Sequence, residues 1–208
     1  FVSGIGNGPA RQVRLGCYHL DSCISSAVVG APVFTSPIPV TKRANKSFTE
    51  IEIRVIEPSD ISAMGTVIRT VMTEFGAVGE GFSIQDPEVD DMCESYAGHR
   101  ARYFVAIADG VLLGGAGFAQ LQGAQPWTCE LRKMYLLAES RGLGLGRRLL
   151  QLCLEQAAEF SYTECYLETL GHMDKALGLY AKYGFEPLAG PLGRTGHHGC
   201  DTWLLKKL

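Results

Sequence analysis

Several patterns that would assign a chain to a common protein class are missing from this sequence. No run of about 18 apolar residues occurs, so we expect no membrane-spanning helix. None of the seven cysteines forms a Cys-x-x-Cys pair. Cys129, Cys153 and Cys165 lie among apolar neighbours, which is typical of buried thiols in a reducing compartment. We therefore predict a cytoplasmic protein without a disulfide framework.

Signals for a metal site and for nucleic-acid binding are also weak. The segment His197-His198-x-Cys200 lacks a second pair of ligands, so we predict no metal. The net charge of -3 is unevenly spread, because residues 1–49 hold five basic residues and one acidic residue, and residues 50–208 hold 14 basic and 21 acidic residues. An acidic main domain argues against nucleic acid and for a cationic or amine substrate.

Two common nucleotide-binding motifs are absent as well. No Gly-x-x-x-x-Gly-Lys-Ser/Thr occurs, which excludes a Walker loop. The dinucleotide fingerprint Gly-x-Gly-x-x-Gly would need a glycine where the sequence has Arg147 or Leu149. A nicotinamide-dependent oxidoreductase therefore finds no support in this chain.

The chain is organised around a glycine-rich stretch, Leu131 to Gly146. It reads as a strand, a short loop and a helix start, with glycine at alternate positions 142, 144 and 146. The first N–H groups of a helix lack partners within it and favour anions, so such a turn can bind phosphate oxygens. Four charged side chains of this helix have the sign that the helix dipole disfavours at their end, and an anionic ligand at the helix start would explain this. The alternative is that these side chains are simply solvated. These charges belong to Arg147, Arg148, Glu155 and Glu159.

The motif that remains is Arg141-x-x-Gly144-x-Gly146. It resembles the Gln/Arg-x-x-Gly-x-Gly/Ala acyl-coenzyme A motif of the GNAT superfamily of N-acyltransferases. A second segment, Ala176-Leu-Gly-Leu-Tyr-Ala-Lys-Tyr-Gly-Phe185, looks like the closing helix of that family, with its tyrosine and its Gly-Phe ending. Together the two segments extend the resemblance over residues 51–208.

Hydrophobic periodicity predicts an α/β (α+β) domain. Strands are indicated at 51–56, 102–108, 111–120, 128–137, 163–170 and 201–206, and helices at 61–75, 88–96, 145–160 and 172–183. Asp109-Gly110 predicts a hairpin, whereas the strand–helix–strand segment 131–170 needs a right-handed crossover that makes its strands parallel. We expect a mixed, mostly antiparallel central sheet with helices on both faces. The resemblance implies that the parallel strand pair is splayed.

We divide the chain into an N-terminal extension, residues 1–49, and a GNAT-like acetyltransferase domain, residues 50–208. Within the extension, Cys23 to Val40 shows neither helical nor strand periodicity, and its role is not assigned. The basic composition loosely resembles that of a targeting segment. We favour an arm that packs on its own domain or on a partner subunit, so that a homodimer is one expectation.

The resemblance implies acetyl-coenzyme A as co-substrate and assigns its contacts. The pantetheine arm would lie in the gap between the splayed strands, bonded to main-chain groups of Met134, Tyr135 and Leu136. The Leu136 N–H would donate to the reacting carbonyl oxygen. The diphosphate would meet the glycine turn and its flanking residues, which are Arg141, Gly142, Leu143, Gly144, Leu145, Gly146 and Arg147.

Acyl transfer from a thioester to an amine needs a neutral amine, a polarised carbonyl and a protonated leaving thiolate. Tyr180 matches the family tyrosine that protonates the thiolate, and an ordinary core tyrosine is the alternative. Glu130 and Glu168 are rival bases. Glu168 is alternatively an anchor for the amine, and Glu130 could equally be a charge paired with arginine. His172 is a third candidate for the base and is placed on the acceptor side. We place His197 at the rim of the acceptor site.

We therefore expect an N-acetyltransferase that moves an acetyl group to a primary amine of a small molecule by direct attack within a ternary complex. The loop 76–85 is the candidate for acceptor choice. Transfer to a protein N-terminus or to a lysine is an alternative. A non-catalytic acyl-coenzyme A sensor or interaction module is an alternative of a different class.

Overall fold

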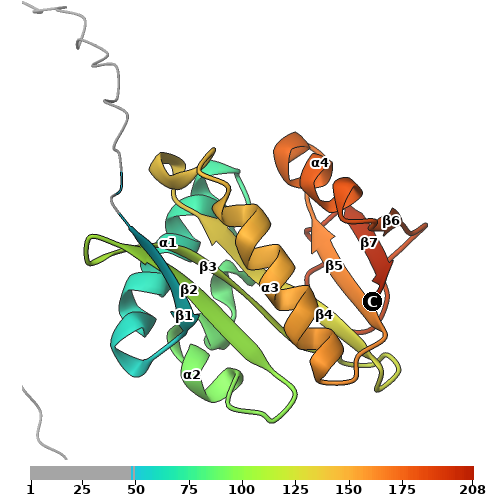
Figure 1. Ribbon diagram of the computed structural model, residues 1–208. Coiled ribbons are helices and arrows are strands. Elements are labelled where there is room, and N and C mark those ends of the chain that lie inside the picture. The colour runs from blue at the N-terminus through green and yellow to red at the C-terminus, as the bar shows by residue number, and fades with distance from the viewer. Residues whose placement is uncertain (1–47, 49) are drawn as a thin grey trace, which may run out of the picture. The chain divides into compact units, whose positions relative to one another are not determined.

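The computed structural model describes residues 48 and 50–208 of the chain (Figure 1). The predicted extension, residues 1–49, therefore lies almost entirely outside the described residues, as does the arm that could reach a second subunit. Within the described part, no helix is both long enough and apolar enough to cross a membrane.

One seven-stranded sheet forms the centre of the domain, in the order β1-β2-β3-β4-β5-β7-β6. Among the strands of residues 50–208, only β4 and β5 pair in parallel, and every other pair of neighbours is antiparallel. This confirms the predicted mixed, mostly antiparallel sheet. The strands are β1 (Ile51–Val55), β2 (Arg102–Ala108), β3 (Val111–Gln120), β4 (Thr128–Leu136), β5 (Glu164–Thr169), β6 (Glu186–Pro187) and β7 (Thr202–Lys207).

Helices cover both faces of the sheet (Figure 1). The α-helices are α1 (Ile61–Glu74), α2 (Met92–Ser95), α3 (Leu145–Glu159) and α4 (Asp174–Lys182). Short 3-10 turns connect them, namely η1 (Pro58–Asp60), η2 (Ser83–Gln85), η3 (Pro87–Asp90) and η4 (Ala138–Ser140). Residues of α3 and α4 pack into one apolar core, whereas residues of α1 and α2 pack into a second core on the opposite face.

The two cores follow from the alternation of side chains along the strands. On the α3 face, Leu149 and Cys153 pack with Phe118 of β3, and on the α1 face Met64 packs with Val105 of β2. All five of these side chains are at most 1% exposed, and burying a large apolar side chain contributes roughly 1.5–3 kcal/mol. The sheet therefore carries a separate apolar core on each face.

Two elements differ from the sequence-based expectation. The helix predicted at 88–96 is broken into η3 and α2, because Asp91 between them has φ −144° and ψ 49°, outside the helical region. The two-residue strand β6 was not predicted, because Pro187 indicates only the end of the preceding helix. The hairpin at Asp109-Gly110 is confirmed, since both residues have the positive φ that a tight hairpin turn needs.

The parallel strands β4 and β5 pair along only a short part of their length. Their register runs from Thr128 opposite Glu164 to Glu130 opposite Tyr166 and then stops. Beyond that point both strands continue without pairing with each other, and their divergence can be followed in Figure 1. This confirms the splayed pair that the resemblance implied.

A bulge in β4 lies where the two strands have separated. Tyr135 pairs with Gly115 and Arg132 pairs with Gly117, so Lys133 and Met134 together stand opposite a single residue of β3. Lys133 has φ 48°, in the left-handed region that residues other than glycine seldom adopt. The bulge therefore places a strained backbone beside the gap.

Candidate active site

The glycine turn joins the end of β4 to α3. Gly142 and Gly144 have φ of 85° and 77°, and a Cβ added at either would meet no atom within 4 Å. Their main chain is thus uncovered on the side where a side chain would project. Helix α3 begins at Leu145, so the turn presents helix-start N–H groups to an anion. These residues fit the predicted diphosphate site.

Arg141 at the start of this turn is bound to protein groups. Its Nη1 and Nη2 donate to the two carboxylate oxygens of Glu74 in α1 at 2.5 and 2.6 Å, and its Nε donates to the Leu136 carbonyl at 3.0 Å. Its guanidinium also lies over the Phe75 ring. The main-chain N–H of Arg141 donates to the Ala138 carbonyl. In this structure Arg141 therefore fixes the turn to α1.

The other predicted diphosphate residues differ in exposure. Leu143 is 44% exposed and Arg147 is exposed, so both project from the turn. Leu145 is buried against the sheet. A Cβ added at Gly146 would make ordinary contacts with the side chains of Met134 and Leu136. The turn is thus seated directly on the residues that line the gap.

The edge of β4 that faces the gap carries main-chain donors. The Leu137 N–H donates to the Leu113 carbonyl of β3 at 2.9 Å. Because successive N–H groups of a strand point in opposite directions, the N–H of Leu136 points away from β3, toward β5. The Met134 N–H shares that direction. The Tyr135 side chain lies on the α1 face, where its hydroxyl is 3.2 Å from the Ser83 hydroxyl.

Tyr180 of α4 lies beside the gap on the other face of the sheet. It is 7% exposed, its ring packs against Phe185, and its hydroxyl is 4.0 Å from the Met134 sulfur. Burial raises the pKa of Tyr180 above its ordinary value. The hydroxyl therefore keeps its proton at neutral pH and can donate it.

A cavity of about 80 Å³ lies in the gap between β4 and β5. Residues of α1, the loop after it, β4, β5 and α4 surround it, and most of them are apolar. Its polar lining comes from Ser83, Lys133, Tyr135, Glu168, Thr169, Tyr180 and Cys200. The cavity thus brings Tyr180 from one face of the sheet and Glu168 from β5 to the same space.

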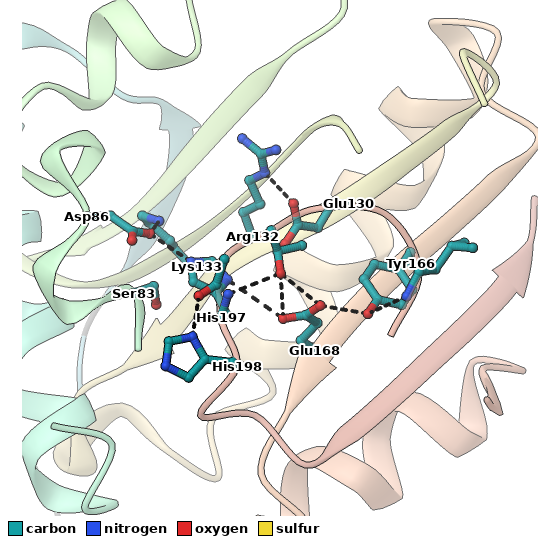
Figure 2. A network of polar contacts seen from close by, with 12 residues as sticks. Ser83, Asp86, Glu130, Arg132, Lys133, Tyr166, Glu168, His197 and His198 are labelled. Atoms are coloured by element: carbon teal, nitrogen blue, oxygen red, sulfur yellow. Dashed lines mark hydrogen bonds and ion pairs between the residues drawn. The ribbon is translucent and has the colours of Figure 1, made fainter. Parts of the chain in front are cut away.

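The Glu168 carboxylate is held by hydroxyl groups (Figure 2). The Tyr166 hydroxyl donates to Oε1 at 2.7 Å, and the Thr195 hydroxyl lies 2.9 and 3.0 Å from the two oxygens. The Glu168 side chain is only 4% exposed. These donors orient a buried carboxylate at the wall of the cavity.

His197 connects Glu168 to the loop after α1 (Figure 2). Its Nε2 is 3.0 Å from Asp86 Oδ2, and its Nδ1 is 3.8 Å from Glu168 Oε2. Burial lowers the pKa of His197, but the hydrogen bond and charge of Asp86 outweigh burial and raise it above its ordinary value. Burial raises the pKa of Asp86, and His197 and Lys133 together bring it down to about 2. The pair is therefore an ion pair in mildly acidic solution.

Besides His197, two of the predicted catalytic and acceptor residues lie outside this cavity lining. The Glu130 carboxylate accepts a hydrogen bond of 2.7 Å from Arg132, and it stands in the section where β4 and β5 are still paired. Burial raises the pKa of Glu130, against the influence of Arg132. His172 is exposed, with Nε2 3.2 Å from the Phe75 carbonyl oxygen. His172 is thus outside the cavity, whereas Glu130 is near enough to Glu168 and His197 for their charges to act on its pKa, although it does not line the cavity.

The site also contains residues that the sequence reading missed. Lys133 has a side chain only 2% exposed, and its Nζ donates to Asp86 at 2.7 Å and lies 3.6 Å from Glu88. The loops 76–85 and 190–199 meet, because the Gly199 N–H donates to the Gly81 carbonyl. Asp86 was assigned no role in the site from the sequence. No local pattern signals these contacts, since they join residues far apart in the sequence.

A second hollow, of about 530 Å³, lies away from the glycine turn, at the C-terminal end of α3. Arg100 fills a structural role there, because its guanidinium donates to the carbonyls of Pro126, Phe160 and Ser161. Such contacts satisfy the free carbonyls at a helix end. Among the residues that the structure describes, no group of three or more His, Cys, Asp or Glu is arranged to hold a metal ion.

Comparisons with known proteins identify relatives of this chain. The sequence profile of the acetyltransferase (GNAT) family matches residues 69–185. YjgM of Escherichia coli (strain K12), named as an uncharacterised N-acetyltransferase, is 37% identical over 157 residues, which covers 75% of this chain and 94% of YjgM. An uncharacterised N-acetyltransferase of Schizosaccharomyces pombe is 27% identical over 146 residues, covering 70% of this chain and 85% of that protein.

Solved structures share the fold. A GNAT-family acetyltransferase from Staphylococcus aureus Mu50 superposes with a TM-score of 0.67 at 19% identity, covering 76% of this chain and 99% of that one. The yncA protein of Salmonella typhimurium, solved with its cofactor acetyl-CoA, gives a TM-score of 0.61 at 19% identity and covers 76% and 93% of the two chains. The family profile spans more than half of this chain. The protein is therefore an N-acetyltransferase of the GNAT family.

Proposed function

We propose that the protein transfers the acetyl group of acetyl-coenzyme A to a primary amine of a small molecule, by direct attack within a ternary complex. One observation carries this proposal: the gap between β4 and β5 connects the two faces of the sheet. The glycine turn of α3 and Tyr180 of α4 adjoin the gap from one face, and Glu168 borders the same cavity. Reactants entering from opposite faces would meet inside the gap, which removes much of the entropic barrier.

Acetyl-coenzyme A supplies the acetyl group as a thioester. The helix-start amides after Gly144 would hold its diphosphate, and the N–H groups of Met134 and Leu136 would bind along the pantetheine arm. The Leu136 N–H would donate to the thioester carbonyl oxygen as negative charge develops there. The Tyr180 hydroxyl would give its proton to the departing sulfur when the carbon–sulfur bond breaks.

Glu168 is the residue that we assign to the acceptor amine. Its buried carboxylate lines the cavity, so it can attract the ammonium form of the acceptor and accept one proton from it, which leaves the neutral amine free to form the carbon–nitrogen bond. Glu130 is the weaker candidate, because Arg132 already occupies its carboxylate. We assign His197 to orienting Glu168 and His172 to the outer rim.

The enclosure of the cavity favours a small acceptor over a protein chain. Its volume is about 80 Å³, and the loops 76–85 and 190–199 meet over this face through the Gly81–Gly199 hydrogen bond. Phe82 adds to this contact, because a Cβ added at Gly199 would lie 2.6 Å from the Phe82 ring. An extended polypeptide would need both loops to move apart, whereas a small amine needs less space.

The test is acetyl transfer to a panel of small amines and lysine-containing peptides, measured by thiol release and by mass spectrometry with labelled acetyl-coenzyme A. Tyr180→Phe should lower kcat by roughly 10²- to 10⁴-fold, the usual contribution of a general acid. Tyr183→Phe is the matched control, because its hydroxyl lies at the end of the same helix and contacts Gln151. We expect its turnover to stay close to wild type.

The possible results separate the alternatives. Transfer to peptides but to no small amine would replace the proposal with a protein acetyltransferase. Binding of acetyl-coenzyme A in calorimetry without transfer to any amine would favour a sensor. An unchanged kcat in Tyr180→Phe, with melting temperatures equal to wild type, would remove Tyr180 from the mechanism.

A further inference from the structure

Three glycines in β3 need an explanation, because glycine weakens a strand. Two of them make room for one tyrosine of β2. A Cβ added at Gly115 would lie 2.7 Å from Cε1 and 3.0 Å from the hydroxyl of Tyr103, and a Cβ at Gly117 would collide with Cδ2 of the same ring. The Tyr103 ring therefore lies across β3, in the space that two side chains would otherwise fill.

The hydroxyl of this ring reaches the bulge of β4. It donates a hydrogen bond of 2.7 Å to the Lys133 carbonyl, and Tyr103 is 0% exposed. Burial raises the pKa of Tyr103 well above its ordinary value, so the hydroxyl keeps the proton that it donates. The hydrogen bond from Tyr103 thus holds the main-chain carbonyl of Lys133, the residue with φ 48°.

This hydrogen bond fixes the direction of the next amide. In a trans peptide the carbonyl of one residue and the N–H of the next point in opposite directions. Because the Lys133 carbonyl points over β3 toward Tyr103, the Met134 N–H points away from β3, into the gap. The Leu136 N–H has the same direction, as the bond from Leu137 to β3 indicates.

We propose that Tyr103 is a positioning residue for acetyl transfer: its hydroxyl clamps the β4 bulge and so aims the Met134 N–H at the thioester, beside the N–H of Leu136. This inference rests on the proposed function, in which the thioester lies in the gap. Tyr103 touches no reacting atom and acts only through the main chain of β4. It also accounts for Gly115 and Gly117, where a side chain would collide with the Tyr103 ring.

The experiment compares Tyr103→Phe with Tyr162→Phe. Tyr162 is the matched control, because it is 2% exposed and its hydroxyl donates a bond of 2.9 Å to a main-chain carbonyl, that of Arg100, remote from the gap. Both changes remove one buried hydroxyl and should lower the melting temperature by similar amounts. Only Tyr103→Phe should lower kcat, by roughly tenfold or more, because small displacements of catalytic groups are costly. The KM for acetyl-coenzyme A should change much less.

Hydrogen exchange of the free protein gives a second readout that needs no acceptor. Tyr103→Phe should speed exchange at the Leu137 amide, whose hydrogen bond to Leu113 joins β4 to β3 beside the bulge, and Tyr162→Phe should leave that amide unchanged. Unchanged exchange in Tyr103→Phe, unchanged kcat, or equal losses of kcat in both variants would each overturn the proposal. If the wild type acetylates no amine, the proposed function fails by itself, and the exchange result alone then supports or overturns the clamp.

Discussion

His197 is the residue whose contribution to the site depends most directly on pH. It carries the contact between Asp86 and Glu168, and its pKa is raised above the ordinary value. A raised pKa means that its stabilising effect is complete below the pKa of the unfolded chain, about 6.5, and is lost as pH rises through the folded value. The pKa of Asp86 is lowered, so its stabilising effect is complete above the pKa of an unfolded aspartate, about 4. This effect is lost as pH falls toward the folded pKa of about 2.

We therefore predict that His197→Asn destabilises the protein most at mildly acidic pH, between about 4 and 6.5. The difference from wild type should shrink as pH rises above that range. Thermal unfolding of both proteins across the pH range measures this directly. His198→Asn is the control, because its ring contacts the Gly196 carbonyl and not a carboxylate. A difference between wild type and His197→Asn that grows with pH would contradict the ion pair.

Individual site residues could be predicted from the sequence where they belong to a recognisable motif. Residues whose role depends on a contact with a distant part of the chain could not. Tyr180 and the glycine turn were found because each stands at fixed spacing within a continuous segment. Tyr103 was not found, because its partner Lys133 lies 30 residues away in the sequence and two strands away in the sheet. The glycines of β3 are the sequence signal for it, because glycine inside a strand indicates that another group lies close to the backbone.

At the scale of elements, the turn into α3 depends on the backbone freedom of glycine. Gly144 has φ 77°, so Gly144→Ala should destabilise the fold by about 1–2 kcal/mol, the cost of a left-handed residue with a side chain. Coenzyme A affinity should fall as well, because the methyl group would project from the uncovered face of the turn. Unfolding in urea and binding calorimetry measure the two effects.

Gly178 supplies the matched control for that change. It lies inside α4, and a Cβ added there would meet no atom within 4 Å. Gly178→Ala should therefore stabilise the protein by about 0.5–1 kcal/mol, because alanine favours a helix interior. Its coenzyme A affinity should match wild type. If Gly144→Ala and Gly178→Ala changed the affinity for coenzyme A equally, a specific role of the glycine turn in binding it would be excluded.

The bounds of elements whose hydrophobic periodicity extends over many residues were predicted closely. The bounds of short elements were not. The strands β2 and β3 have the predicted bounds, and α1 and α3 each end one residue early. The splitting of 88–96 and the existence of β6 depend on tertiary contacts that four or fewer residues cannot encode by themselves. The same holds for the meeting of loops 76–85 and 190–199.

At the scale of the whole molecule, ligand binding and folding should be linked. Coenzyme A at 100 times its Kd would stabilise the folded state by about 2.7 kcal/mol. For a chain of 208 residues this raises Tm by roughly 5–10 °C. Pantetheine at the same concentration should give a much smaller rise, because it lacks the diphosphate. Equal shifts with both ligands, followed by differential scanning fluorimetry, would contradict diphosphate binding at the glycine turn.

The divergence of β4 and β5 has a consequence for solubility. A strand with unpaired main-chain groups normally invites pairing with another chain and hence aggregation. In this domain the open edge of β4 lies in the interior of the sheet, with β5, β7 and β6 beyond it. A foreign strand would have to enter between two halves of the same sheet to reach it. The protein can therefore keep a row of donors ready for a ligand without presenting them to its neighbours.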